Sequence, residues 1–175
     1  MSTEQEGLKR FAFALGGGAL GALLVKNHHR EAKKSRAEID DAEGVEWLCT
    51  LIDDLLEEWT PRSYDTEDEY TQALYRYLNR RLPDELEEDD EVEVELWPTT
   101  SCGVPDILIN GQLVLELKID PDKGGRDRGI GQCADYSREF VTWMVIIGSP
   151  AWRIQELEDL LVDRGLDGIK VISFT

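Results

Sequence analysis

This sequence has few cysteines, histidines and basic residues. The three cysteines, Cys49, Cys102 and Cys133, are odd in number and none forms a C-x-x-C pair. Their spacing indicates neither a disulfide framework nor a zinc site. The two histidines, His28 and His29, adjoin an apolar run, and we do not expect them to be catalytic. The cysteine pattern favours a reducing, cytoplasmic location.

Basic residues are outnumbered, with 19 Lys and Arg against 37 Asp and Glu. Residues 1–36 hold seven Lys/Arg and three Asp/Glu, so a tail of charge +4 precedes a body of charge −22 over residues 37–175. An acidic body opposes nucleic-acid binding, because phosphate binding depends on Lys and Arg. A high-salt cytoplasm favours such a surface and screens its repulsion from DNA. A halophilic source would therefore reconcile the charge with a DNA partner.

Long apolar runs are also scarce, and residues 11–25 are the membrane candidate. This uncharged run has fifteen residues, fewer than the ~20 that usually span a bilayer. Charged sequence follows it without an A-x-A-like cleavage site, so a secretory signal fits poorly. Gly17 and Gly21 have the spacing of packed membrane helices, whereas three successive glycines lower helix propensity. Two interpretations stay open: an anchor that holds the body at the cytoplasmic face of a membrane, or a soluble helical tail.

The body predicts one amphipathic helix followed by one domain. Within residues 37–60, apolar residues from Val45 onwards recur at helical spacing. The broad apolar face with Trp47 and Trp59 also suits a homo-oligomer contact. Residues 61–175 are expected to form an α/β domain, which the helix packs against.

Within this domain, turn and cap signals divide the sequence into short elements. Thr66 and Glu69 have the spacing of a capping box, and Pro83 is expected to end the helix that follows Thr66. Asn110-Gly111 between two apolar runs predicts a β-hairpin. The resulting order, ααβββαβαβ, indicates a mixed α/β sheet. After the helix of residues 66–82, we expect strands at 92–97, 104–109 and 113–119, a loop at 120–128, a helix at 130–140, a strand at 143–148, a helix at 152–164 and a strand at 169–174.

The register of the hairpin can be predicted from its hydrophobic pattern, because a slip of one residue moves every side chain to the other face. A two-residue turn would oppose Asp106 to Leu115 and bury an unpaired charge among leucines. A three-residue loop, Ile109-Asn110-Gly111, instead opposes Asp106 to Val114 and leaves one face wholly apolar. The other face then gathers two carboxylates and an amine: Asp106, Glu116 and Lys118.

Two carboxylates and a lysine on one sheet face suit a divalent cation. Mg²⁺ prefers oxygen ligands and keeps water or substrate phosphate in its remaining positions. We therefore expect Asp106 and Glu116 to bind Mg²⁺ or Mn²⁺, and Lys118 to orient a water or contact a phosphate. Alternating charges on a solvent-facing strand are the competing explanation.

These residues also carry a family resemblance. Pro105-Asp106 followed by Glu116-Leu117-Lys118 resembles the signature of the PD-(D/E)XK phosphodiesterase superfamily. Gln132 and Tyr136 resemble the Gln-x-x-x-Tyr motif of nuclease domains in recombination helicase-nucleases. The resemblance implies a restriction-endonuclease-like mixed sheet with an αβββαβ core, here preceded by an N-terminal helical tail, and a metal-dependent hydrolysis of DNA phosphodiester bonds.

The same resemblance implies supporting residues. The family uses a glutamate from its first core helix, for which Glu69 is the candidate and Glu67 the alternate, although Glu69 is also explained as the partner of the helix cap. Independently of the resemblance, Arg126 and Arg128, in the predicted loop before the Gln132 helix, are candidate phosphate ligands, and solvated side chains are the competing explanation. The alternative function is a non-catalytic, nuclease-like module that binds a protein or a nucleic acid.

Overall fold

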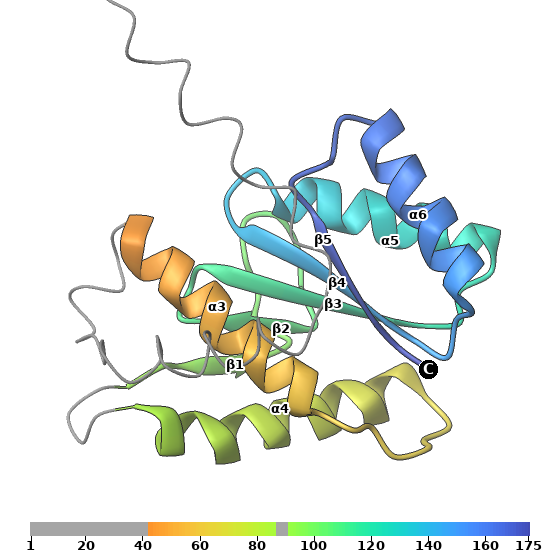
Figure 1. Ribbon diagram of the computed structural model, residues 1–175. Helices are drawn as coiled ribbons and strands as arrows, with labels where there is room; N and C mark the ends of the chain where they lie inside the picture. The colour runs from red at the N-terminus through yellow and green to blue at the C-terminus, as the bar shows by residue number, and fades with distance from the viewer. Residues whose placement is uncertain (1–41, 87–90) are drawn as a thin grey trace, which may run out of the picture. The chain divides into compact units, whose positions relative to one another are not determined.

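The computed structural model describes residues 42–86 and 91–175 (Figure 1). The predicted tail and the apolar run at 11–25 lie outside these residues. Within the described ranges, no helix has both the length and the apolar character needed to cross a membrane. The predicted order ααβββαβαβ is confirmed. The elements are α3 (Ala42–Glu58), α4 (Glu67–Glu85), β1 (Val94–Leu96), β2 (Ile107–Ile109), β3 (Leu113–Ile119), α5 (Lys123–Tyr136), β4 (Val141–Ile147), α6 (Ala151–Asp163) and β5 (Lys170–Phe174).

The five strands form one mixed sheet in the order β1-β2-β3-β4-β5. The pairs β1–β2 and β2–β3 are antiparallel, whereas β4 and β5 run parallel to β3. Parallel neighbours need a crossover connection, and α5 and α6 provide the two crossovers that follow β3 and β4. The predicted α/β class with a mixed sheet is therefore confirmed.

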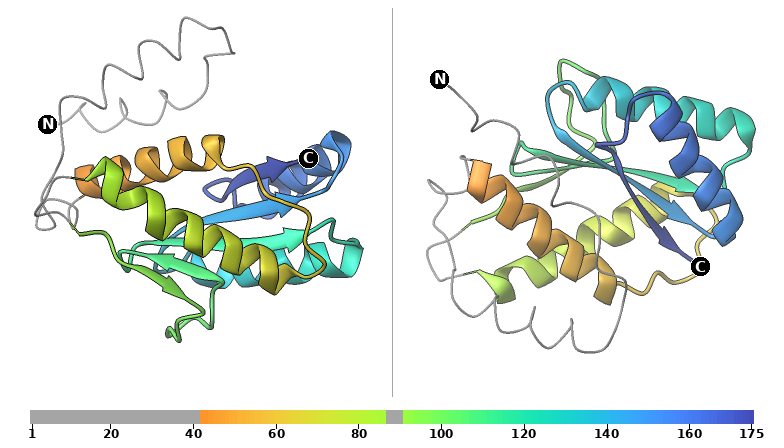
Figure 2. Two further views of the ribbon diagram at one scale, coloured as in Figure 1. Left: turned by 90° about the horizontal axis from the view of Figure 1, so that it is seen from below. Right: turned by 45° about the horizontal axis from the view of Figure 1, so that its top comes forward.

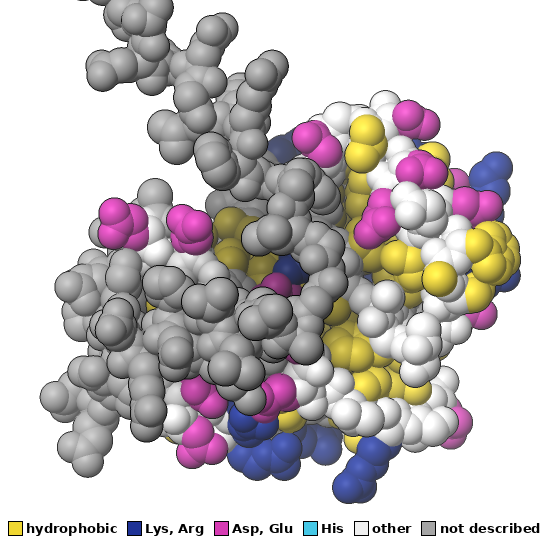
Figure 3. All heavy atoms as spheres, in the orientation of Figure 1, with side chains coloured by type: hydrophobic (Ala, Val, Ile, Leu, Met, Phe, Trp, Pro, Cys, Tyr) yellow, Lys and Arg dark blue, Asp and Glu magenta, His cyan; other side chains and the backbone are white. Residues whose placement is uncertain are grey.

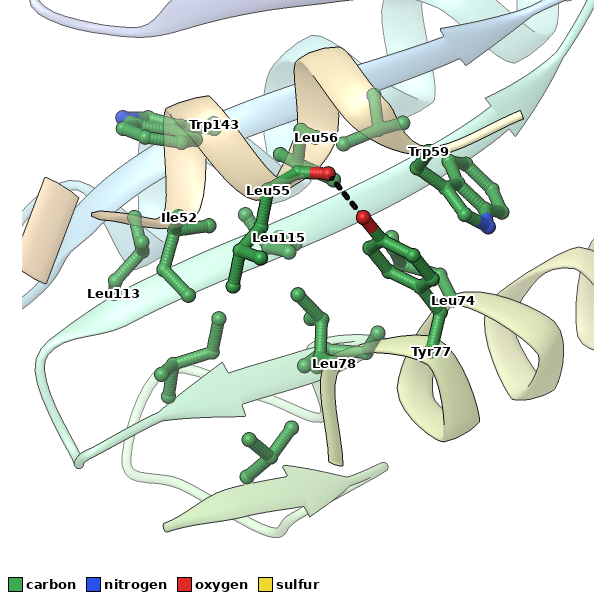
Figure 4. Packing of buried hydrophobic residues seen from close by; sticks show 14 of the residues in the cluster. Ile52, Leu55, Leu56, Trp59, Leu74, Tyr77, Leu78, Leu113, Leu115 and Trp143 are labelled. Carbon is green, nitrogen blue, oxygen red and sulfur yellow. Dashed lines mark hydrogen bonds between the residues drawn. The ribbon is translucent and has the colours of Figure 1, made fainter. Parts of the chain in front are cut away.

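Helices cover both faces of the sheet (Figures 1 and 2). One apolar cluster joins α3 and α4 to the sheet, and another joins α5 and α6 to its opposite face. Figure 4 shows Leu113 and Leu115 facing the side chains of α3 and α4, where the hydroxyl of Tyr77 donates to the carbonyl of Leu55 at 2.8 Å. Trp59 is buried in this cluster and Trp47 packs against it. The apolar face of α3 that suggested oligomerisation is thus covered within the domain itself.

Helix α4 begins where predicted but ends later. The capping box of α4 is present: Thr66 Oγ1 accepts from the amide of Glu69 at 3.3 Å, and Glu69 Oε2 accepts from the amide of Thr66 at 3.1 Å. Pro83, however, lies inside α4, which continues to Glu85. Proline removes one hydrogen bond of a helix, but Leu82 and Leu86 on either side of it are buried. Their packing holds the last turn on the core.

The predicted loop at 120–128 is largely helical, because α5 begins at Lys123. Asp122 caps this helix by accepting from the amide of Gly125 at 2.7 Å. An aspartate at this position satisfies one of the free amide groups of a first turn, so the glycines that follow it do not prevent a helix. The helix ends at Tyr136, earlier than predicted, and β4 begins at Val141.

Candidate active site

The hairpin register differs from the predicted one. Ile107 pairs with Leu115, not with Leu113, because the three-residue loop spans Asn110 to Gln112. The loop thus begins at Asn110, one residue later than predicted, and its first two residues, Asn110 and Gly111, are left-handed with φ of 51° and 65°. A shift of two residues leaves every side chain on its face. The prediction that one face of the hairpin is apolar is therefore confirmed although the register was wrong.

Asp106 immediately precedes β2, and continuing the register by one residue sets it opposite Glu116. Its backbone carbonyl accepts from the amide of Trp97 at 3.0 Å, and its Oδ2 accepts from the amide of Leu117 at 2.7 Å. These two bonds tie Asp106 to the residue that follows β1 on one side and to β3 on the other. Burial raises the pKa of the Asp106 carboxyl above its usual value, against the opposing effect of the Leu117 hydrogen bond.

Lys118 bonds to one carboxylate of β3 and to one of α4. Its Nζ donates to Glu116 Oε1 and Glu67 Oε1, both at 2.9 Å, and to the carbonyl of Leu117 at 2.7 Å. Glu116 is 1% exposed and Lys118 7%. The second oxygen of Glu116, Oε2, is buried and has no hydrogen-bond partner. The ammonium is therefore fully bonded, whereas the carboxylate beside it has a free, buried acceptor.

The electrostatics of the site show an excess of negative charge. Burial, followed by repulsion from Asp106, raises the pKa of Glu116 to about 7. Burial alone would lower the pKa of Lys118, but attraction and hydrogen bonding by Glu116 and Glu67 raise it above its usual value. Lys118 stays charged at neutral pH, while Glu116 is near the midpoint of its titration. A second cation at this place would favour the ionised form of Glu116.

These groups face a pocket of about 630 Å³. It lies at the carboxyl end of β3 and at the amino end of α5, where its walls combine carboxylates with basic and amide groups. The polar side chains that line it and were predicted for the site are Glu67, Asp106, Glu116, Lys118, Arg128 and Gln132.

Gln132 and Tyr136 have different positions although both lie on α5. Gln132 lines the pocket. Tyr136 is 3% exposed, packs against Leu108 and Val114, and is hydrogen-bonded to the side chain of Gln132. Burial raises the pKa of the Tyr136 hydroxyl to about 12, so it remains protonated at neutral pH. Tyr136 therefore does not line the pocket, but its hydrogen bond positions the side chain of Gln132, which does.

Besides Tyr136, two further predicted residues, Glu69 and Arg126, do not line the pocket. Glu69 is exposed and serves as the cap partner of Thr66; the glutamate of α4 that reaches Lys118 is Glu67. Arg126 lies in α5, not in a loop, and donates to Glu156 of α6 at 2.9 Å. Arg126 thus joins two helices, which accounts for its position without a phosphate.

Sequence reasoning did not single out Asp120 and Asp122, which also line the pocket. Asp120 directly follows β3 and Asp122 lies two residues further on, and residues at the carboxyl ends of strands commonly form ligand sites in α/β folds. Each has a structural partner: Asp120 accepts from Ser149 Oγ at 3.1 Å and pairs with Arg153, and Asp122 caps α5. Their position at the strand end was the signal that could have identified them.

The donor set suits an open metal site. Within residues 42–86 and 91–175, no three His, Cys, Asp or Glu side chains form a closed metal cluster. Mg²⁺, however, is commonly held by one or two carboxylates, with waters and phosphates as its other ligands. Asp106 and Glu116 are two such carboxylates, and Glu116 Oε2 is a buried oxygen without a partner. The residues present therefore fit a divalent cation.

Comparisons with protein-family models, with curated proteins and with solved structures gave no match to this chain. The inference of function therefore rests on the site.

Proposed function

We propose that this chain is a metal-dependent nuclease that hydrolyses DNA phosphodiester bonds. The observation that carries the proposal is the buried carboxylate of Glu116, which faces an open pocket beside Asp106. One of its oxygens is bonded to Lys118, and the other has no hydrogen-bond partner. Buried charges contribute little net stability, because desolvation offsets their attraction. Strongly perturbed carboxyl groups in a pocket are instead typical of catalytic sites.

Each residue has a role in this proposal. Asp106 and Glu116 hold the ion. When bound, Mg²⁺ or Mn²⁺ supplies activation of a water and stabilisation of charge on the phosphate. Lys118 contributes a fixed positive charge towards the phosphate, and Glu67 keeps its ammonium anchored from α4. Gln132 and Arg128 line the same pocket and would contact the substrate strand.

The order of elements is consistent with the resemblance noted in the sequence. From α4 to β4 the elements follow one another as αβββαβ, which is the order that the PD-(D/E)XK resemblance implies. The restriction-endonuclease-like fold is part of the proposal, since its support here is the element order together with the positions of Asp106, Glu116 and Lys118.

The test is cleavage of single- and double-stranded DNA by the full-length chain, with and without Mg²⁺ or Mn²⁺, at low and at high salt. Asp106→Asn and Lys118→Gln should each lower metal-dependent cleavage about 100-fold or more, because the first weakens a metal ligand and the second removes the positive charge directed towards the phosphate. Asp135→Asn, an exposed acid on the same α5 layer, is the matched control and should cleave as wild type. The proposal fails if all substrates stay uncut, or if both site variants retain cleavage.

A non-catalytic binding module is the second candidate. The observation in its favour is the ion-pair network, in which Lys118 already bonds both Glu116 and Glu67. A thermal unfolding series with Mn²⁺ separates the two candidates. A nuclease site should gain stability from the ion in wild type and lose that gain in Asp106→Asn. If DNA raises the melting temperature but Mn²⁺ never does, and no cleavage occurs, the binding module is the better explanation.

A further inference from the structure

A second hollow, of about 450 Å³, lies beside α4 and the loop that precedes it. It shares no lining residue with the pocket around Asp106. Figure 3 shows Lys and Arg side chains gathered along the lower edge of the molecule, where α4 lies in Figure 1. The hollow combines three guanidinium groups with three aromatic rings, from Arg62, Arg76, Arg80, Trp59, Tyr64 and Tyr77.

The helix of α4 places these groups together. Arg76 and Arg80 are one turn apart and therefore project from the same face. Tyr77 lies between them, and Cζ of Arg80 is 5.9 Å from the centroid of its ring. Arg62 belongs to the segment between α3 and α4. Three basic side chains from two parts of the chain thus meet at one place.

The floor of the hollow is held rigidly by the core. The Tyr77 hydroxyl donates to the carbonyl of Leu55 at 2.8 Å (Figure 4). The Trp59 ring packs edge-on against Phe174, with 4.9 Å between ring centroids. Because Trp59 and Tyr77 are fixed in this way, the hollow exists before any ligand arrives.

The arginines of the hollow have no acidic partner in the described part of the chain. No ion pair joins Arg62, Arg76 or Arg80 to a carboxylate of residues 42–86 or 91–175, and the hydrogen bond of Arg76 goes to the neutral Gln72. Arg81, one residue further along α4, is by contrast paired with Glu58. Like charges one turn apart are destabilising. Their gathering in a body of charge −22 is thus not explained by folding.

We propose that this arginine hollow binds the phosphate backbone of a nucleic acid, away from the pocket in which the strand is cut. Guanidinium groups bind phosphate oxygens in pairs of hydrogen bonds and remain charged at all relevant pH values. Such contacts hold the backbone without reading bases, so the binding should be independent of sequence.

The choice of a nucleic acid over an acidic protein rests on the proposed nuclease function. The cleavage pocket is itself acidic, since Glu67, Asp120 and Asp122 line it in addition to the two proposed metal ligands. A polyanionic strand therefore gains little from that pocket before an ion is bound, and needs positive charge elsewhere. The arginine hollow supplies that charge on a chain whose overall charge opposes the association.

Binding of a fluorescein-labelled oligothymidylate to the full-length protein tests the proposal, by anisotropy over a salt series and without divalent ions, so that no cleavage occurs. Arg76→Gln/Arg80→Gln should weaken binding about tenfold or more. The slope of log affinity against log salt should fall by about 1.4, because two phosphate contacts to a single strand are lost. Arg62→Gln, outside the helix, should weaken binding in the same direction.

The matched control is Arg138→Gln/Arg164→Gln. It removes the same two charges, from exposed arginines paired with Asp135 and Asp127, and should bind as wild type. Equal losses in both double variants would reduce the effect to net charge and overturn the proposal. It would also be overturned by unchanged binding in all variants, or by binding of a polyglutamate peptide without binding of the oligothymidylate. Arginine-dependent binding without metal-dependent cleavage would support the hollow while rejecting the nuclease.

Discussion

The two faces of β3 can be compared residue by residue, because its side chains point alternately to the two helical layers. The layer of α3 and α4 covers Leu113, Leu115 and Leu117, whereas the opposite layer covers Val114, Glu116 and Lys118. All six side chains are at most 7% exposed. Burial of the leucines stabilises the fold, but burial of the charged pair is opposed by desolvation. Equal burial therefore stabilises the fold on one face, whereas on the other face it is explained by the metal site that we propose.

The largest effect on stability is expected from a substitution on the apolar face of β3. Leu115→Ala should lower the free energy of unfolding by about 2–5 kcal/mol, because it removes a fully buried side chain and leaves a cavity. Urea unfolding at pH 5 and pH 8 should give the same loss, since no titratable group is changed. Cleavage per folded molecule should be retained at a temperature where the variant is folded. A loss that changes with pH would show that the two faces are energetically coupled.

A somewhat smaller, pH-dependent effect is expected on the charged face. An unfolded glutamate titrates near 4.5 and Glu116 at about 7, so between these values the native state keeps a proton that the unfolded chain has released. Stability of wild type should therefore fall as the pH rises through this window, by on the order of 3 kcal/mol. Glu116→Gln removes this titration, and its stability should fall less over the same range. Unfolding free energies of both proteins from pH 4 to pH 8 provide the measurement.

Stabilisation by a metal ion tests the charged face of β3 in a second way. At pH 8, where Glu116 is ionised, Mn²⁺ at about 100 times its dissociation constant should stabilise wild type by about 3 kcal/mol. The gain should shrink below pH 7 and be largely lost in Glu116→Gln. Parallel pH profiles for the two proteins, or equal stabilisation by Mn²⁺, would contradict the assignment of Glu116.

The parts of the fold that the sequence predicted correctly depend on local periodicity. The alternation of leucines with Glu116 and Lys118 fixed the faces of β3, and the Thr66 capping box located the start of α4. The register of the hairpin could not be predicted in the same way, because registers two residues apart satisfy the same alternation. Which of these two registers forms depends on which residues of the turn are left-handed. The start of α5 was not predicted, because the glycines after Asp122 have low helix propensity, which favours a loop.

The site was predicted less completely than the fold, because tertiary contacts decide which side chains enter it. The sequence places Arg126 and Arg128 two residues apart, but α5 directs Arg128 to the pocket and Arg126 to Glu156. Likewise, Glu67 and Glu69 are close in sequence and occupy different environments. The two arginines differ because they project from different sides of α5, and the two glutamates differ because of where α4 lies relative to β3. Neither property can be predicted from a local sequence pattern.

The smallest effect is expected from the two glutamates of α4. Glu67→Gln should lower cleavage about 10- to 100-fold, because it weakens the second anchor of Lys118, with little change in melting temperature. Glu69→Gln should instead lower the melting temperature slightly, through the capping box, and leave cleavage intact. Thr66→Ala is the matched control for the cap and should cost about 1 kcal/mol of stability. If Glu69→Gln reduces cleavage as strongly as Glu67→Gln while both proteins are folded, the site extends to the cap and the separation of these two residues is wrong.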